Sequence, residues 1–268
     1  MWIRYSVDHL VLDGNRSARI GSAAYQMCKS GGNTGNRYGY NAQFLGCANC
    51  SLSNSASING LCGTGFEWTG DDAQIRNNRF QANGNHFDSK LWADGLTLLK
   101  SDRAIVTNNT FAENSDVSFI FGGGINASIT GNIITQAVMT AFAGLMMDNF
   151  NGGTPGDFRG TVVSANSVQC NNCVYGVNIG PHAWYPSANL IGGNVSNNYI
   201  RGGSITFNID GAGTSANPLV ISGNDLGPYR TPYPRYGCST NARFNVSPDS
   251  VVSSAAPDTT QYTHGCIK

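Results

Sequence analysis

Charge, long apolar runs and helical periodicity are all scarce in this sequence. Only 12% of the 268 residues are charged, well below the roughly 25% of an average domain. The 16 basic and 16 acidic residues balance, and no basic stripe suits a phosphate backbone, which argues against nucleic-acid binding. No apolar run approaches the roughly 20 residues that a membrane-spanning helix needs. The surface must therefore be polar through Asn, Ser, Thr and the 34 glycines rather than through charge.

A short phrase built around asparagine is what the sequence has in abundance. An aliphatic residue, two small or polar residues, an asparagine, any residue and an apolar residue recur six times at intervals of 23 to 34 residues. The asparagines of the six phrases are Asn78, Asn109, Asn132, Asn166, Asn198 and Asn224. Such a period predicts a solenoid. An asparagine at one fixed point per coil predicts a ladder of side-chain amides at a turn, where a left-handed backbone is tolerated.

A strand with strict alternation precedes each asparagine phrase. These segments are 65–69, 95–99, 118–122, 144–148, 176–180 and 206–210. Their second and fourth positions are apolar, so these side chains should face inward and those of the third and fifth positions outward. We predict an all-β, single-domain parallel β-helix of about eight coils over residues 1–230, roughly 40 Å long at ~4.8 Å per coil. Residues 231–268 are expected to form an irregular, disulfide-clipped tail packed on it.

The asparagine phrase and the alternating strands together resemble right-handed parallel β-helix proteins of the pectate-lyase-like superfamily. The resemblance covers about Val7 to Leu226 and implies a right-handed coil. That superfamily holds lyases, hydrolases, epimerases, phage tailspikes and adhesins, so the fold alone does not give a function. Of the polygalacturonase motifs only Asp71-Asp72 is present. The run Tyr175-Gly-Val-Asn-Ile-Gly-Pro-His182 is similar to the Tyr-Gly-apolar-Asp-Pro-His element of alginate C5-epimerases, with Asn for Asp and two extra residues.

Eight cysteines in a chain of low charge predict an oxidising compartment and structural disulfides. Two pairs are spaced as C-x-x-C, Cys47/Cys50 and Cys170/Cys173, but their separation by several coils disfavours a shared zinc site. Cys238 and Cys266 suit a clip on the C-terminal tail. We expect a secreted protein whose signal peptide and N-terminal cap are missing from this sequence, because neither is visible before Val7.

The outward fifth position of the alternating strands carries the leading catalytic candidates. It places Asp148 and Asp210 two coils apart with Gly180 between them. Two coils give roughly 9 to 10 Å between the carboxyl groups, near the upper limit for an inverting glycosidase. The same coil then supplies side chains suited to proton transfer and to seating a sugar, namely His182, Trp184 and Tyr185. A turn role at the end of a strand fits both aspartates equally well.

Other polar side chains on the same face are secondary candidates. Besides Trp184 and Tyr185, the substrate-binding candidates are Glu67, Asn178 and Asn208 from the outward third position, and Lys100. Asp94 and Asp116 precede strands on adjacent coils, so their carboxylates should lie ~5 Å apart. Such a pair can hold calcium or supply the nucleophile and acid of a retaining glycosidase, although turn roles fit as well. Lys90 and Lys100 provide the cations that a uronate lyase needs.

We therefore expect a polysaccharide-degrading enzyme, most simply a glycoside hydrolase on a neutral or weakly acidic glycan, with Asp148 and Asp210 as acid and base. It requires no cofactor, and calcium is an option. The alternatives are a polysaccharide lyase or C5-epimerase with a base such as His182 or Lys100, and a non-catalytic glycan-binding, adhesin or tailspike-type rod. Neither nucleic acid nor membrane is an expected partner. The apolar outward residues of three successive coils predict a surface for homo-oligomers, formed by Leu99, Ile120 and Met146.

Overall fold

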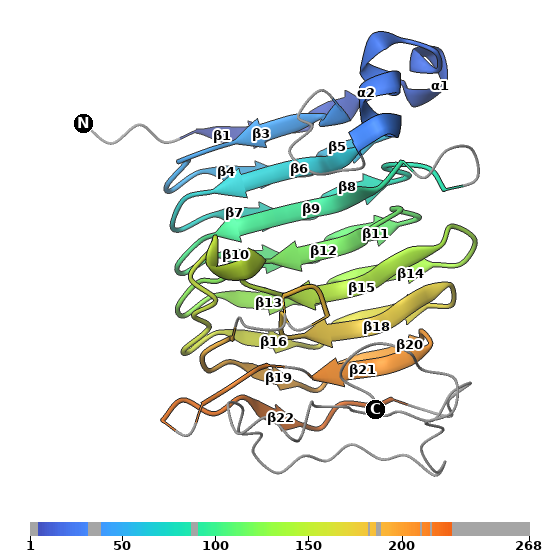
Figure 1. Cartoon of the computed structure of the whole chain (residues 1–268). Helices are drawn as coiled ribbons and strands as arrows, with labels where there is room; N and C mark the ends of the chain where they lie inside the picture. The colour runs from blue at the N-terminus through green and yellow to red at the C-terminus, as the bar shows by residue number, and fades with distance from the viewer. Residues whose placement is uncertain are drawn as a thin grey trace.

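The computed structural model describes residues 5–31, 39–86, 91–181, 183–185, 189–209, 211–214 and 216–226. Over this part the chain winds as a parallel β-helix, and Figure 1 shows its rows stacking from the N-terminal to the C-terminal end. The expectation of a mainly β solenoid with parallel pairing is confirmed. The proposed tail over 231–268, with Cys238 and Cys266, lies outside the described residues.

Three parallel sheets form the walls of the solenoid in the described part of the chain. The first sheet holds β1 (Ser6–Asp8), β4 (Ser51–Ser53), β7 (Gln74–Arg76), β10 (Ile105–Thr107), β13 (Ser128–Thr130), β16 (Val162–Ser164), β19 (Asn194–Ser196) and β22 (Val220–Ser222). The second holds β2 (Val11–Asp13), β5 (Ala56–Ile58), β8 (Arg79–Gln81), β11 (Thr110–Ala112), β14 (Ile133–Gln136), β17 (Ser167–Cys170) and β20 (Tyr199–Gly202). The third holds β3 (Ala42–Phe44), β6 (Gly63–Thr69), β9 (Ala93–Lys100), β12 (Val117–Phe121), β15 (Ala141–Met147), β18 (Cys173–Ile179) and β21 (Ile205–Ile209).

The six asparagines of the repeated phrase form the expected ladder between the first and second sheets. The side-chain amides of the first five donate to the side-chain oxygen of the asparagine on the next coil, at 2.9 to 3.0 Å, and that of Asn224 donates to the Val195 carbonyl. The same oxygen also accepts the backbone N–H of the asparagine below it, as Asn109 Oδ1 does from Asn78 at 2.9 Å. The left-handed conformation belongs to the preceding residue, for example Asn108 with φ 56°. The ladder thus satisfies polar groups that the solenoid buries at this turn.

The strands of the third sheet carry the interior as their alternation predicts. Phe66 and Trp68 on β6 are buried, as are the equivalent inward residues of the next five coils. The ring of Phe80 stacks on that of Phe111 at 5.0 Å, and Phe111 stacks on Phe119 at 5.6 Å. Aromatic stacking therefore joins neighbouring coils through Phe80 and Phe111, and joins two walls of the same coil through Phe111 and Phe119.

Glycines at the same position of neighbouring strands, such as Gly95 and Gly144, interrupt the alternation of inward and outward side chains in the third sheet. A Cβ on Gly95 would lie 2.4 Å from the Ser118 carbonyl oxygen, and one on Gly144 would lie 2.7 Å from the Gly176 carbonyl oxygen. Adjacent coils therefore approach too closely there for any side chain. On β9 the residues before and after this point, Asp94 and Thr97, face the same side and are hydrogen-bonded at 2.7 Å.

Disulfides secure the N-terminal end of the solenoid and two of its turns. Cys28 in α2 (Ala23–Gly31) is bonded to Cys62, and Figure 1 shows α2 and α1 (Arg16–Arg19) at the N-terminal end. Each C-x-x-C pair closes on itself, Cys47 with Cys50 and Cys170 with Cys173. All four of these cysteines are engaged in disulfides, which confirms the expected structural disulfides over the shared zinc site that the sequence disfavoured. None of the described helices has the length and apolar character to cross a bilayer.

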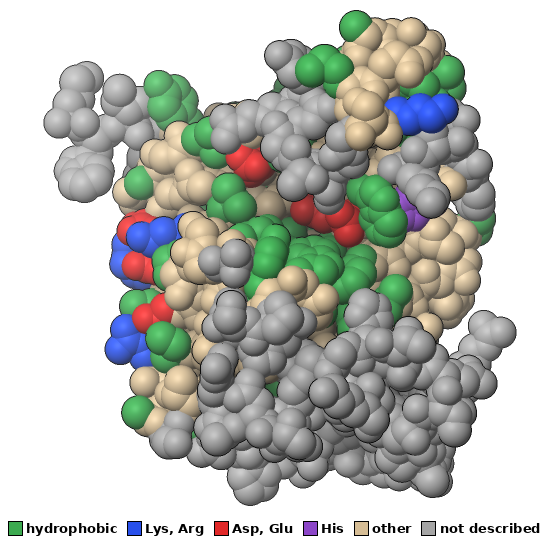
Figure 2. Space-filling view, in the orientation of Figure 1, with side chains coloured by type: hydrophobic (Ala, Val, Ile, Leu, Met, Phe, Trp, Pro, Cys, Tyr) green, Lys and Arg blue, Asp and Glu red, His purple; other side chains and the backbone are tan. Residues whose placement is uncertain are grey.

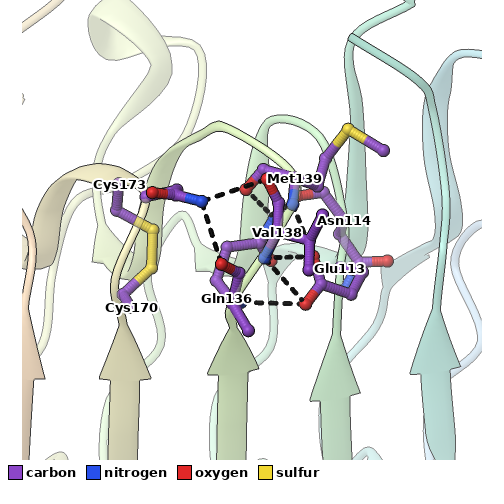
Figure 3. The surroundings of a disulfide bond; sticks show 9 residues. Glu113, Asn114, Gln136, Val138, Met139, Cys170 and Cys173 are labelled. Carbon is purple, nitrogen blue, oxygen red and sulfur yellow. Dashed lines mark hydrogen bonds between the residues drawn. A yellow bond between two sulfur atoms is a disulfide. The ribbon is translucent and has the colours of Figure 1, made fainter. Parts of the chain in front are cut away.

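The loop between β14 and β15 is held by Glu113 on the neighbouring coil. Its carboxylate accepts backbone N–H groups from Ala137, Val138 and Met139, the last at 2.7 Å. Figure 3 shows Glu113 pointing toward this loop, beside the disulfide of Cys170 and Cys173 on the next coil. A buried Gln136 amide donates to the carbonyl of Met139 from the other side. The apolar stretch after β14 is therefore an ordered turn.

Candidate functional site

A cleft of about 450 Å³ lies on the outer face of the third sheet, along β6, β9, β12 and β15. Its described lining is acidic, aromatic and apolar, with Tyr40, Gly63, Glu67, Trp92, Asp94, Thr97, Leu99, Asp116, Phe142, Phe150, Trp184 and Tyr185. Figure 2 shows acidic side chains directly beside hydrophobic ones on this face. Carboxyl groups beside aromatic rings are typical of sites that bind and transform sugars.

Asp94 lies at the centre of the acidic part of the cleft. Its Oδ1 accepts the backbone N–H of Val117 at 3.0 Å, and its Oδ2 lies 2.7 Å from the hydroxyl of Thr97. Burial raises the pKa of Asp94 to about 7, with the nearby charge of Glu67 adding to the effect against these two hydrogen bonds. A carboxyl group with a pKa near neutrality holds a proton that it can deliver at physiological pH.

Two further carboxyl groups lie on either side of Asp94. Glu67, on β6 of the preceding coil, accepts a hydrogen bond from Gln43 Nε2 at 2.8 Å and is nearly buried. Asp116 lies just before β12 on the following coil, where its backbone N–H donates to the carbonyl of Ala93 at 3.0 Å. Asp116 is also nearly buried. The cleft thus presents three acidic side chains from three successive coils, although Glu67 is paired in register with Thr97 and Asp94 with Thr64.

Aromatic side chains form the opposite wall of the cleft. The Phe142 ring lies 4.7 Å from that of Trp184, with an angle of 30° between their planes. Backbone N–H groups of both Trp184 and Tyr185 donate to the carbonyl of Pro181, which forms the tight turn that presents the two rings. The pKa of Tyr185 is raised, first by burial and then by the charges of Asp148 and Asp116. Tyr185 thus responds to the charges of both aspartates while its side chain lines the cleft.

Asp148 has the expected position in the sheet but lies below the surface. Its backbone N–H donates to the Phe121 carbonyl at 2.9 Å, and the N–H of Gly180 donates to Met147, so the predicted register of Gly122, Asp148 and Gly180 is confirmed. Asp148 is fully buried, and burial raises its pKa to about 7. Its Oδ1 accepts the N–H of Asn149 at 2.7 Å, whereas Oδ2 has no hydrogen-bond partner among the described residues.

Asp148 is covered by the loop that follows it. That loop includes the short 3-10 helix η2 (Phe150–Gly152), and the ring of Phe150 lies within 2.9 Å of where a Cβ on Gly122 would stand. The glycine of the preceding coil is therefore required for this loop to fold back over the sheet. Asp210 and His182, the expected partners of Asp148, lie outside the described residues, so that pair stays a prediction.

The other candidates from the sequence fall into two groups. Trp184, Tyr185, Glu67, Asp94 and Asp116 all line the cleft. Asn178 and Asn208 do not; both are buried and hydrogen-bonded to each other at 2.6 Å. Lys100 is exposed at the end of β9 and is not among the residues of the cleft, and Lys90 lies outside the described part.

The expected exposure of the apolar outward column is wrong for two of its three residues. Ile120 and Met146 are fully buried in a second hydrophobic cluster outside the sheet, and only Leu99 remains partly exposed. The residues that cover them come from loops and neighbouring strands, including Phe142, Phe150 and Trp184. Ile120 and Met146 are therefore covered by other parts of the same chain. A homo-oligomer stays a prediction, but these residues no longer support it.

Several cleft residues were not identified from the sequence, notably Tyr40, Trp92, Phe142, Phe150 and the hydroxyl of Thr97. Trp92 lies directly before β9, and Phe142 is the second residue of β15. No group of three or more His, Cys, Asp or Glu side chains suited to a metal ion occurs in the described part of the chain. Calcium at Asp94 and Asp116 stays a prediction.

Comparison with known proteins gives no relatives that assign a function. No protein-family model, no curated protein and no solved structure matches this chain. The functional argument therefore depends on the cleft itself.

Proposed function

We propose that this protein is a glycan-acting enzyme, most simply a glycoside hydrolase, whose general acid is Asp94. The observation that carries the proposal is the cleft, in which Asp94 lies among Glu67, Asp116 and aromatic rings, and where burial raises the pKa of Asp94 to about 7. Glycosidases need one carboxyl group that is protonated at the working pH and a second that is ionised. The environment of Asp94 supplies the first of these.

In the proposed reaction Asp94 donates its proton to the glycosidic oxygen of the leaving group. Glu67 or Asp116, on the coils before and after, then acts as the nucleophile or as the base that activates water. A nucleophile would give retention of configuration at the sugar and a base would give inversion, and the distance between the two carboxyl groups decides between them. We therefore assign the acid and leave the second carboxylate to experiment. Asp148 is less suited to either role because it is fully buried beneath the Phe150 loop.

The chemistry of the cleft favours an uncharged or amine-bearing glycan over a uronate. Three acidic side chains line it, and each would repel a carboxylate or sulfate on the sugar. The rings of Trp184, Tyr185 and Trp92 offer apolar surfaces to the faces of sugar rings. This narrows the expected substrate from neutral or weakly acidic glycans to those without negative charge.

Three disulfides in the described part support secretion, because such bonds persist in oxidising compartments. We also infer that the coil is right-handed and that the chain is allied to the pectate-lyase-like superfamily. The asparagine ladder and three-sheet stacking support that placement. A measured crystal structure would test the hand of the coil directly.

The decisive experiment is incubation with a panel of neutral, amine-bearing and acidic polysaccharides, following new reducing ends and the ultraviolet absorbance of unsaturated products. We expect reducing ends without absorbance on a neutral or amine-bearing substrate. We also expect a loss of about 10²-fold or more in kcat for Asp94→Asn. Asp225→Asn, an exposed aspartate paired with Arg201 on the second sheet, is the matched control and should retain activity.

Two results would overturn the proposal. Unsaturated products would indicate a lyase. Tight glycan binding with no product from any substrate would favour a non-catalytic binding rod on the same aromatic wall. In the hydrolase case, Glu67→Gln and Asp116→Asn identify the second carboxylate, because azide restores activity only to the variant that has lost the nucleophile or base.

A further inference from the structure

A short chain of hydroxyl groups leads from Asp94 into the sheet. The Oγ1 of Thr97 lies 2.7 Å from Asp94 Oδ2 and 3.0 Å from the Oγ1 of Thr64 on the preceding coil. The hydroxyl of Thr64 donates to the Phe66 carbonyl at 3.1 Å, and its oxygen accepts the N–H of Phe66 at 3.2 Å. Both threonines are nearly inaccessible to solvent. Water therefore competes little for these hydrogen bonds.

Counting hydrogens shows how the chain depends on the protonation of Asp94. Each threonine hydroxyl carries one hydrogen, so Thr97 cannot donate to Asp94 and to Thr64 at the same time. When Asp94 is protonated on Oδ2, it donates to Thr97, Thr97 donates to Thr64, and Thr64 donates to the Phe66 carbonyl. When Asp94 is ionised, Thr97 must turn and donate to the carboxylate, which leaves one hydrogen bond fewer in the chain.

The other oxygen of Asp94 fixes the site of the proton. Oδ1 accepts the N–H of Val117 at 3.0 Å. An oxygen that accepts a backbone hydrogen bond is the poorer place for a proton, so the acidic hydrogen belongs on Oδ2, the atom nearest Thr97. The carboxyl group is thus held at both ends, by a backbone donor on one coil and by a hydroxyl on its own strand.

We propose that Thr97, supported by Thr64, is a positioning residue that holds the proton of Asp94 before transfer and stabilises its carboxylate afterwards. This inference rests on the proposed role of Asp94 as the acid. In the step, the O–H bond of Asp94 breaks and an O–H bond forms on the leaving-group oxygen. The electron pair stays on Oδ2, and the hydroxyl of Thr97 rotates to donate to it. Thr64 then rotates to donate to Thr97, so that the chain reverses its direction.

Other groups that face Asp94 also influence its ionisation. Glu67 approaches from β6, where Gln43 holds its carboxylate, and Asp116 lies before β12. The titratable hydroxyl of Tyr40 lines the same cleft. Because these neighbours remain in a Thr97 variant, a change in the behaviour of Asp94 on replacing Thr97 reports on the hydroxyl itself.

The test is the pKa of Asp94, measured from the ¹³C chemical shift of its carboxyl carbon, in the wild type and in Thr97→Val and Thr97→Ser. Hydrogen bonds to a charged acceptor are stronger than neutral ones, so Thr97→Val should raise the pKa of Asp94 by about one unit, a tenfold change in ionisation. Thr97→Ser, which keeps the hydroxyl, should restore it. Thr64→Val should move the pKa of Asp94 less than Thr97→Val does, because Thr64 reaches Asp94 only through Thr97. Thr130→Val on the first sheet is the matched control and should leave the pKa unchanged.

Activity provides the second readout. Thr97→Val should lower kcat with little change in KM, and the pH at which activity falls on the alkaline side should move upward with the pKa. A folded Thr97→Val variant with an unchanged Asp94 pKa, or a Thr97→Ser variant that behaves like valine, would overturn the inference. The chemical-shift titration needs no substrate. A shifted pKa together with full activity in Asp94→Asn would therefore reject the proposed function while keeping the hydroxyl chain.

Discussion

The rings of Phe142 and Trp184 lie 4.7 Å apart and are tilted by 30°, which joins a strand residue of one coil to a loop residue that follows the next. Phe142 also meets the ring of Tyr175 edge-on at 5.2 Å. The loop that carries Trp184 and Tyr185 is therefore held against the sheet by aromatic packing, and it presents its remaining surface to the cleft.

Replacing Trp184 by alanine should weaken glycan binding more than it slows the chemical step. The indole supplies apolar contact area in the cleft, and loss of a buried aromatic anchor costs about 2 kcal/mol or more in binding. We expect Kd and KM to rise about thirtyfold or more, with kcat reduced less. Titration calorimetry with the substrate identified in the panel measures this. Tyr199→Ala, on the exposed face of the second sheet, is the control; equal effects of both variants would contradict a role for the Trp184 ring.

The buried carboxyl group of Asp148 should make the protein less stable as the pH rises. Its pKa is raised by burial to about 7 in the folded state, against 3.8 for the free side chain. The folded protein therefore binds more protons than the unfolded chain between these values. The free energy of unfolding should accordingly fall as the pH rises from about 4 to about 7, by on the order of 3–4 kcal/mol at most.

Asp148→Asn isolates this contribution. The amide carries no charge at any pH, so the variant should lose part of the pH dependence. Relative to the wild type it should be more stable at pH 8 than at pH 5. Urea unfolding at the two pH values measures the difference. An identical pH dependence in the variant and the wild type would show that Asp148 ionises in the folded state as readily as in water.

Breaking the asparagine ladder at its centre should destabilise the whole solenoid. The side chain of Asn109 accepts the backbone and amide hydrogens of Asn78 and donates to Asn132 and to the Ile75 carbonyl. Asn109→Ala leaves several of these buried groups without partners, at a cost of about 3–5 kcal/mol. Denaturant unfolding gives the value. Asn108→Gly is a matched control next to it, because Asn108 is exposed and its φ of 56° suits glycine. If Asn109→Ala were as stable as Asn108→Gly, water would be replacing the hydrogen bonds that the Asn109 side chain makes.

Removing the disulfide between Cys28 and Cys62 should loosen α2 more than loss of either C-x-x-C bond loosens its turn. The Cys28–Cys62 bond closes a loop with a sequence separation of 34, against 3 for each of the others. Chain entropy assigns the longer loop about 3–4 kcal/mol. Cys28→Ser/Cys62→Ser should therefore be cleaved by protease within residues 16–31 before the coils are. Cys47→Ser/Cys50→Ser is the comparison, and cleavage that starts in the coils of both would contradict this order.

The fold could be predicted because each coil repeats the same local interactions. A ladder asparagine such as Asn109 and an inward pair such as Phe66 and Trp68 recur on six coils, so one pattern is observed many times. A second, shorter ladder of amide side chains was not predicted, because its residue type does not repeat from coil to coil. Asn83 donates to Asn114 at 2.8 Å, but the column continues as Gln136 rather than as another asparagine.

The site was only partly predictable because it depends on contacts between segments far apart in sequence. Alternation correctly gave the register of Asp148 and the place of Glu67, but it could not show that the Phe150 loop folds back over Asp148. Nor could it show that Ile120 is covered from outside. The pairing of Asp94 with Thr97 depends on the break in alternation at Gly95, which the strand pattern alone leaves undetermined.

The three carboxyl groups of the cleft come from three consecutive coils, each held at a fixed register by its strands. In such an arrangement, spacing along the axis is a multiple of about 4.8 Å. Gene duplication or loss of a whole coil between β6 and β12 would move the carboxylates apart or together by that unit without disturbing the strands on either side. Changes in the length of the loop after β18 would instead move Trp184 and Tyr185, which form part of the aromatic wall. Evolution can therefore adjust the spacing of the reacting groups separately from this part of the sugar-binding surface.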